Sequence, residues 1–220
     1  MVTGASGGLG VSVVRHLLDR GAILHTPMVE AKAPPHLTQD GVHATASVDL
    51  GDEAQVAAWF ASLPSIWASI HLVGGFVMKS IADTKLADLD QMLSLNTRTT
   101  FLACREAVVA MRRGGHGGRI VNVIARPALV PAAGFVAYAA SKAAVASMTQ
   151  TLAAELVAEN IFVNAIAPSI IDTPANRAAM PKADFDTWPK ALEIARAMAD
   201  LASPDNQVTS GALVPVYGRA

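Results

Sequence analysis

The chain has 220 residues, of which 52% are hydrophobic and 16% are charged, and its formal net charge is −1. This composition provides enough apolar material for a buried core and excludes a disordered chain. The near-neutral charge gives no electrostatic footprint for nucleic acid or an anionic membrane, and the single cysteine excludes a disulfide framework. Because neither a membrane-spanning stretch nor a secretory signal is visible, we expect a soluble cytoplasmic protein.

Short runs rich in β-branched residues alternate with longer stretches rich in alanine and leucine. After a stub at residues 1–2, strands are predicted at 22–26, 42–48, 69–73, 119–124, 161–167 and 212–217. Helices are predicted at 8–20, 52–62, 86–113, 135–160 and 189–202. This alternation indicates βαβ units. The sequence therefore predicts one α/β domain over residues 1–220, a doubly wound and mostly parallel sheet with helices on both faces and a very short first strand.

A glycine-rich turn lies where the stub of the first strand meets the first helix. Gly4, Gly8 and Gly10 fall within residues 3–10. Glycine tolerates positive φ and lets the backbone approach a ligand closely. The helix that follows offers free N–H groups and a positive dipole end, which suit a pyrophosphate. An ordinary tight turn is the alternative interpretation of this segment taken alone.

Tyr138 and Lys142 are four residues apart in a predicted helix and therefore share a face. A phenol is a poor proton donor at neutral pH, and a neighbouring ammonium is expected to lower its pKa and make it a general acid. A core tyrosine beside a surface lysine is the alternative for the pair alone. The six histidines show no spacing typical of metal ligands, so no metal is predicted.

Five segments together resemble the short-chain dehydrogenase/reductase family, in the right order and over the whole chain. They are Thr-Gly-x-x-x-Gly-x-Gly at 3–10, Ser-Leu-Asn-Thr at 94–97, Arg-Ile-Val-Asn-Val at 119–123, Tyr-Ala-Ala-Ser-Lys at 138–142 and Val-Asn-Ala-Ile-Ala-Pro at 163–168. The resemblance implies a Rossmann-type sheet of seven strands and a nicotinamide cofactor. It also implies that Tyr138 donates a proton, that Lys142 holds the nicotinamide ribose, and that Asn96 anchors a proton-relay water.

The same resemblance places the cofactor along the carboxyl ends of the strands. The cofactor-binding residues that it implies, besides Tyr138 and Lys142, are Gly4, Ser6, Gly8, Leu9, Gly10, Asp49, Leu50, Gly74, Pro168 and Thr173. Two departures stand out. His71, Leu72 and Val73 precede Gly74 where the family has Asn-Asn-Ala, and Ser169 stands where the family usually has glycine.

The family's catalytic serine is missing. Thirteen residues before Tyr138 the chain has Ala125, followed by Arg126, and the resemblance implies that both line the substrate site. A serine there donates a hydrogen bond to the substrate carbonyl, so its loss should weaken ordinary ketone reduction. The chain is similar in this respect to the dihydropteridine reductase branch, where hydride goes to a conjugated quinonoid ring. Phe76 would be an aromatic residue beside the nicotinamide, able to stack on a flat substrate.

The segment at 173–188 strengthens the resemblance to that branch. It reads Thr-Pro-x-Asn-Arg-x-x-Met-Pro-x-Ala-Asp-Phe-x-x-Trp and is expected to be a mobile lid, with Trp188 lining the substrate site. The sequence thus predicts hydride transfer to a conjugated acceptor such as a quinonoid dihydropteridine. Two alternatives stay open: a general carbonyl or alcohol oxidoreductase, and a catalytically weak nucleotide-binding or regulatory protein.

Cofactor choice and assembly are also predicted. The family's acidic ribose-binding position falls on Met28, followed by Val29 and Glu30, and neither Gly7 nor Val29 is basic. The missing cation favours NAD over NADP. A small-molecule substrate is the expected partner, with no nucleic acid or membrane. The resemblance implies a homodimer or homotetramer that pairs the predicted helices at 86–113 and 135–160.

Overall fold

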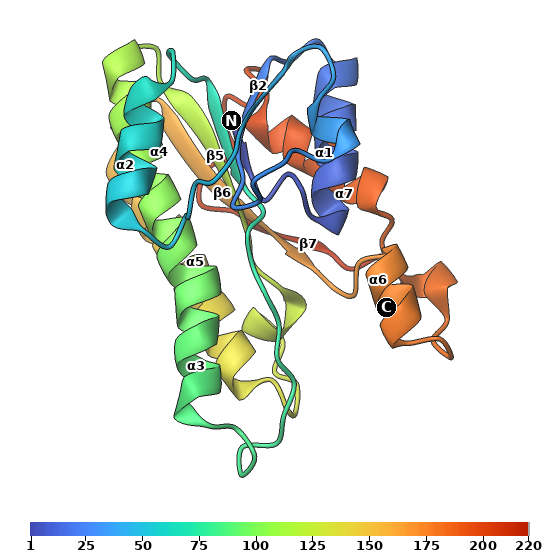
Figure 1. Ribbon diagram of the computed structural model, residues 1–220. Coiled ribbons are helices and arrows are strands. Elements are labelled where there is room, and N and C mark those ends of the chain that lie inside the picture. Colours follow the sequence, from blue (N-terminus) through green and yellow to red (C-terminus); the bar gives the residue numbers. More distant parts are fainter. Residues whose placement is uncertain (220) are drawn as a thin grey trace.

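The computed structural model describes residues 1–219, and these form an α/β fold whose strands are all parallel (Figure 1). Five strands make the central sheet in the order β1-β4-β5-β6-β7, and two more make a separate sheet, β2-β3. The strands are β1 (Val2–Thr3), β2 (Leu24–Pro27), β3 (Val42–Thr45), β4 (Ala68–His71), β5 (Gly118–Val123), β6 (Ile161–Pro168) and β7 (Leu213–Val216).

The first strand explains why one sheet of seven strands does not form. β1 has two residues, and both pair with β4, Val2 opposite Ile70 and Thr3 opposite His71. β2 lies against β1 but forms its ladder with β3 alone among the described residues. A two-residue strand offers too few backbone groups for a ladder on both sides. The described strands thus form one sheet of five and one sheet of two, and the predicted single sheet of seven strands is not confirmed.

Helices cover both faces of the central sheet (Figure 1). One face carries α1 (Gly8–Asp19) and α7 (Ala191–Ala202), which pack together. The other carries α2 (Glu53–Ser62), α4 (Thr99–Gly114) and α5 (Val136–Leu156). Adjacent residues of a buried strand serve opposite faces. In β5, Ile120 joins the core under α2 and α4, whereas Val121 joins the core under α1 and α7.

The helix predicted at 86–113 is interrupted by one wide turn. It consists of α3 (Leu86–Met92), a π-helical turn (Leu93–Arg98) and α4. The hydroxyls of Thr99 and Thr100 donate to the carbonyls of Leu95 and Asn96, four residues back. Such wide turns occur often at functional sites, and this one holds Asn96. Residue periodicity does not reveal a single extra residue in a helix, so the sequence could not predict it.

The loops at the carboxyl ends of the strands carry α6 (Pro174–Ala179) and 3₁₀ turns at Pro35–Leu37, Arg126–Ala128 and Phe185–Thr187. A further 3₁₀ turn, Val157–Glu159, joins α5 to the start of β6. The last residues return to this region, because the Arg219 N–H donates to the Thr187 carbonyl at 2.8 Å (Figure 1). Within residues 1–219, no helix is both long and apolar enough to cross a membrane. The cytoplasmic location stays a prediction.

Candidate active site

The turn after β1 needs glycine at two positions for different reasons. Gly4 has φ +66°, and a side-chain carbon there would lie 2.8 Å from the backbone nitrogen of Val73. At Gly10 the same carbon would collide with the Ala5 carbonyl, because the first turn of α1 packs directly on the loop. The loop is thus pressed against the end of β4 on one side and against its own helix on the other.

The glycine-rich turn and the loop after β6 together form a cradle for an anion. α1 begins at Gly8, and no acidic residue lies in its first turn. A side-chain carbon at Gly8 would lie 3.4 Å from the Thr173 methyl, so Thr173 faces the helix start from across the gap. Free N–H groups at a helix N-terminus and a nearby hydroxyl residue suit a pyrophosphate. Leu9 is partly buried and packs against the core beneath, and its contact with the cofactor stays a prediction.

The hollow beside the glycine-rich turn contains two charged residues, Glu30 and Lys32, that were not among the predicted cofactor-binding residues. The Ser6 hydroxyl donates to Glu30 at 2.9 Å, and Ser6, Glu30 and Lys32 line a hollow of about 540 Å³. Glu30 is two residues beyond the expected acidic position, because the backbone continues past β2 before it turns. Exposed charges just after β2 were the available signal in the sequence.

Asp49 and Leu50 follow the third strand, as predicted, and both side chains make contacts within the protein. The Asp49 carboxylate accepts the Gly51 N–H at 2.8 Å and so stabilises its own turn. The Leu50 side chain is buried in the core under α2. Asp49 is exposed, and its contact with an adenine ring stays a prediction. Pro168 closes β6 and is buried opposite Val216 of β7.

Tyr138 and Lys142 lie on the first turns of α5. The Lys142 ammonium donates to the Val123 carbonyl at the end of β5, 2.8 Å away, and the side chain is 4% exposed. Burial lowers the pKa of Lys142 to about 8 and raises the pKa of Tyr138 to about 12. The expected lowering of the phenol's pKa by the lysine is therefore wrong for the protein without cofactor, where desolvation dominates.

Asn96 is fixed by bonds to the chain after β4. Its amide oxygen accepts the Gly75 N–H at 2.8 Å, and its amide nitrogen donates to the Gly75 carbonyl at 3.0 Å and to the Ser141 hydroxyl at 2.9 Å. A side-chain carbon at Gly74 would lie 2.7 Å from the Asn96 oxygen and 3.1 Å from the Lys142 nitrogen. Gly74 thus lets Asn96 and Lys142 meet at the end of β4, and the role of Asn96 toward a water stays a prediction.

Aromatic rings stand over the tyrosine. Phe76 packs edge-on against Tyr138, with ring centres 5.5 Å apart, and Phe135 lies 5.8 Å from Phe76. Phe76 is 62% exposed. An exposed ring beside the proposed proton donor offers a face for stacking by a flat ligand.

The chain after β5 has no side-chain hydroxyl at Ala125, the position of the family's serine. Ala125 is buried, so no hydroxyl reaches the edge from this position. The next residue, Arg126, lies with its guanidinium carbon 5.0 Å from the Tyr217 ring centre. Tyr217 is held in turn by Ser169, whose hydroxyl donates to the Tyr217 carbonyl at 2.7 Å. Ser169, at the family's glycine position, therefore anchors the C-terminal segment.

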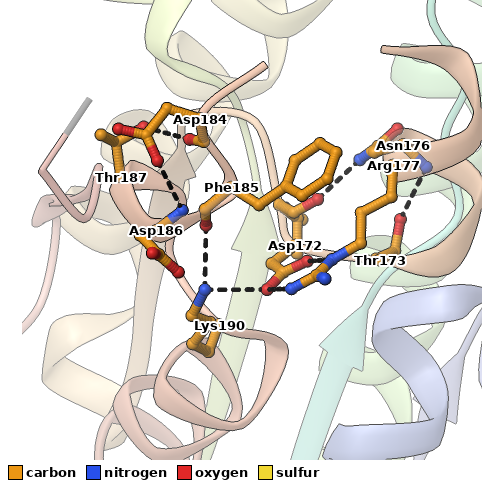
Figure 2. Close-up of polar contacts among 10 residues, drawn as sticks. Asp172, Thr173, Asn176, Arg177, Asp184, Phe185, Asp186, Thr187 and Lys190 are labelled. Atoms are coloured by element: carbon orange, nitrogen blue, oxygen red, sulfur yellow. Dashed lines mark hydrogen bonds and ion pairs between the residues drawn. The ribbon is translucent and has the colours of Figure 1, made fainter. Parts of the chain in front are cut away.

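The segment predicted to be a lid is organised around one carboxylate, as Figure 2 shows. Asp172 accepts two bonds from Arg177, at 2.5 and 2.8 Å, and one from Lys190 at 2.9 Å. These two cations hold the pKa of Asp172 well below its usual range. Lys190 also donates to the Phe185 carbonyl, and the Arg177 guanidinium covers the Phe185 ring. The two ends of the lid are thereby joined.

The segment predicted to be a mobile lid is held by contacts of its own. Thr173 caps α6 by accepting the Asn176 N–H, and the Asn176 amide donates to the Ile171 carbonyl (Figure 2). Trp188 is 5% exposed and packs on Phe185, with ring centres 5.0 Å apart. The indole of Trp188 therefore packs within the lid, and its contact with a substrate stays a prediction.

A buried polar chain supports the site from within the core. His71 bonds Ser69 at 2.7 Å and Asn122 at 2.8 Å, and Asn122 donates to Thr149 of α5 at 2.9 Å. Burial lowers the pKa of His71 to about 4. Cys104 touches the same group, and burial raises its pKa to about 12, so its thiol stays protonated. No group of three possible ligands for a metal ion occurs in the part of the chain that the structure describes.

Comparisons with known proteins agree with this geometry. The family model described as short chain dehydrogenase matches residues 1–184. A short-chain type dehydrogenase/reductase of Picea abies is 30% identical, covering 99% of this chain and 90% of its own, and an NADPH-dependent aldehyde reductase-like chloroplastic protein of Arabidopsis thaliana is 28% identical, covering 99% and 92%.

Solved structures share the fold. A short chain dehydrogenase/reductase family protein has a TM-score of 0.88 at 29% identity over 99% of this chain and 94% of its own. The structure of ElxO with NADP bound has a TM-score of 0.89 at 21% identity, covering 99% and 96%. The chain therefore belongs to the short-chain dehydrogenase/reductase family, a family of NAD(P)-dependent oxidoreductases.

Proposed function

We propose that this enzyme reduces a conjugated acceptor, such as a quinonoid dihydropteridine or a quinone, with Tyr138 as proton donor. The observation that carries the proposal is the buried methyl of Ala125 at the position of the family's serine. Without that hydroxyl, an isolated alkoxide would lose a hydrogen-bond donor. A conjugated ring spreads the developing charge and needs the donor less, and the exposed Phe76 ring offers it a stacking face.

The chain's own residues fit a nicotinamide cofactor. The cradle of Gly4, Gly8 and Thr173 would hold the pyrophosphate, and Lys142 would reach the nicotinamide ribose from the end of β5. When bound, the reduced cofactor supplies the hydride. At neutral pH Tyr138 keeps its proton, because burial raises its pKa to about 12, and can donate it as charge develops on the acceptor. The Lys142 charge, one helical turn away, stabilises the resulting phenolate.

NAD is the proposed cofactor on the strength of Glu30. Its carboxylate, bonded to Ser6, can accept ribose hydroxyls and repels a 2′-phosphate. Lys32 in the same hollow is the group that would favour NADP instead. Glu30→Gln should raise kcat/KM with NADPH, and Lys32→Met should leave NADH kinetics unchanged. A wild-type enzyme that prefers NADPH tenfold would overturn the choice of NAD.

The test of the proposed reaction compares acceptors and one substitution. Reduction of a quinonoid dihydropterin, a quinone and simple ketones is followed as NADH or NADPH oxidation. Ala125→Ser should raise kcat/KM on simple ketones by up to about a hundredfold and leave turnover of conjugated acceptors unchanged. Ala154→Ser, at an exposed position near the end of α5, is the matched control. Efficient reduction of an unactivated ketone by the wild type, unchanged by Ala125→Ser, would contradict the proposal.

General carbonyl reduction is the second candidate, and Arg126 favours it. Its guanidinium follows directly after Ala125 and could donate the hydrogen bond that the serine would have made. The names of relatives such as the aldehyde reductase-like protein point in the same direction. The assembled geometry of Tyr138, Lys142 and Asn96 argues against the third alternative, a protein without catalysis.

A homodimer or homotetramer is proposed for the assembly. α4 and α5 border an outer groove of about 930 Å³, whose lining includes Phe101, half exposed, and Met148. Pairing of this face with a second copy would bury these apolar groups. Light scattering at micromolar concentration should give at least a dimeric mass, and Phe101→Glu should lower it. A monomeric wild type would contradict the assembly.

A further inference from the structure

Arg126 is a cation at the catalytic edge of the sheet. It follows β5 directly, at the edge where Lys142 reaches the Val123 carbonyl. Its backbone is fixed, because the Arg126 carbonyl accepts the N–H groups of Leu129 and Val130 at 2.9 and 2.8 Å. Its guanidinium lies over the Tyr217 ring, and the Ser169 hydroxyl donates to the backbone carbonyl of Tyr217. The side chain is half-buried on a rigid platform and so loses little freedom when a ligand binds.

No carboxylate among residues 1–219 pairs with this guanidinium. Arg177 and Arg112, by contrast, are each held by a carboxylate, Asp172 and Glu159. Neither a salt bridge nor a side-chain hydrogen bond within the described chain uses the Arg126 nitrogens, so its planar fork of N–H donors is available. Such a fork matches the two oxygens of a carboxylate.

The cofactor's phosphates are not the partner of this cation. Their cradle lies between the start of α1 and Thr173, beside β1, whereas Arg126 follows β5, two strands away in the sheet order. Arg126 instead touches Tyr217, which follows β7. It therefore lies on the side of the sheet edge toward the end of β7, away from the phosphate cradle.

Exposed apolar side chains surround the same edge. They come from the loops that follow three neighbouring strands, and they include Phe76, Met78, Leu129, Val130 and Ile170. The first two loops touch, because the Lys79 N–H donates to the Gly134 carbonyl at 2.9 Å. Contiguous exposed apolar groups mark a binding surface. A single cation at the border of such a surface selects a ligand with an apolar body and one anionic group.

From this arrangement we infer that Arg126 binds an anionic group of the substrate, a carboxylate or sulfonate attached to a flat apolar body. The inference rests on the proposed function, since it names the substrate class of that site. It predicts that the enzyme distinguishes ligands by charge at one end while Phe76 and its neighbours accept the body.

The test uses a pair of unreactive ligands that differ in charge. Binding of 2-naphthoate and 2-naphthamide to the full-length enzyme is measured by calorimetry, with and without saturating NADH or NADPH. The wild type should bind the carboxylate at least about tenfold more tightly than the amide, consistent with a charge-assisted bond. Arg126→Gln should bring the ratio to about one, and Arg126→Lys should keep part of it. Arg196→Gln, an exposed arginine on α7, is the matched control and should leave the ratio unchanged.

A turnover experiment separates this inference from the proposed reaction. With 1,2-naphthoquinone and its 4-sulfonate, Arg126→Gln should raise KM for the sulfonate more than KM for the neutral quinone, and Arg196→Gln should change neither. If neither quinone is reduced while 2-naphthoate is still preferred, the proposed reaction fails and the role of Arg126 stands. A wild-type ratio near one, or a ratio that Arg126→Gln does not change, overturns the inference. If Arg126→Gln fails to fold, Arg126→Lys and the loss of preference at high salt decide it.

Discussion

Lowering the pH should reduce the free energy of unfolding of this protein, because one buried histidine is neutral in the folded state. His71 is 2% exposed, and burial lowers its pKa from the usual 6.5 to about 4, partly opposed by the hydrogen bond to Asn122. In the unfolded chain the pKa returns to about 6.5. Between pH 6.5 and 4 the unfolded state therefore binds a proton that the folded state does not, and the free energy of unfolding falls as the pH falls. This contribution is complete above pH 6.5 and is lost by pH 4.

The magnitude follows from the size of the shift. One pKa unit corresponds to about 1.4 kcal/mol, so a drop from pH 6.5 to 5 should cost about 2 kcal/mol and the full window about 3 kcal/mol. Urea denaturation of the wild type and of His71→Asn, measured at several values of pH between 7 and 5, tests this. Asparagine keeps a polar group beside Ser69 and Asn122 but does not titrate.

The pH dependence of the difference between the two proteins is the decisive quantity. The wild type should lose about 2 kcal/mol more than His71→Asn between pH 7 and pH 5. His116→Asn, at an exposed histidine, should show no such difference from the wild type. Equal losses in the wild type and in His71→Asn would refute the argument, because they would assign the acid sensitivity to other groups.

Three further substitutions test the site and its supports. Gly74→Ala should lower kcat at least about tenfold with little effect on folding, since its methyl would displace Asn96 and Lys142; unchanged kinetics would contradict the close approach. Asp172→Asn should speed protease cleavage within residues 174–188 severalfold at low salt, and equal rates would show that the clamp does not hold the lid. Arg119→Met should lower the free energy of unfolding in urea by about 3 kcal/mol, because the buried guanidinium donates to three backbone carbonyls; an unchanged midpoint would contradict that.

Much of the fold could be predicted because each element carries its own periodicity. β5 and β6 consist mainly of buried apolar residues, with Arg119, Asn122 and Asn164 as buried polar exceptions, and their predicted bounds lie within one residue of the observed ones. Tyr138 and Lys142 followed from their spacing on one helix face. The glycine-rich turn was recognisable because Gly4 and Gly10 meet steric demands that only glycine satisfies.

The features that were not predicted depend on side-chain contacts that no local sequence pattern specifies. Asp172 draws together Arg177, five residues on, and Lys190, eighteen residues on, and no local pattern shows that one carboxylate will take both. Glu30 reaches Ser6 across the gap between β2 and the first turn. The pKa of Tyr138 was expected to fall because the lysine was considered alone, whereas the environment that buries the phenol is built by Phe76 and its neighbours.

The cradle follows a first strand that pairs with a neighbouring strand on one side, through β4. β1 lacks a ladder to β2, so its register depends on β4, where Thr3 lies opposite His71 and the Leu72 N–H donates to the Thr3 carbonyl at 3.2 Å. Gly4 then packs on the backbone of Leu72 and Val73. Because β4 is itself tied through His71 and Asn122 to β5 and α5, the cradle and the Tyr138 helix share one buried support. Protonation of His71 should therefore disturb the cofactor cradle and the proton donor together.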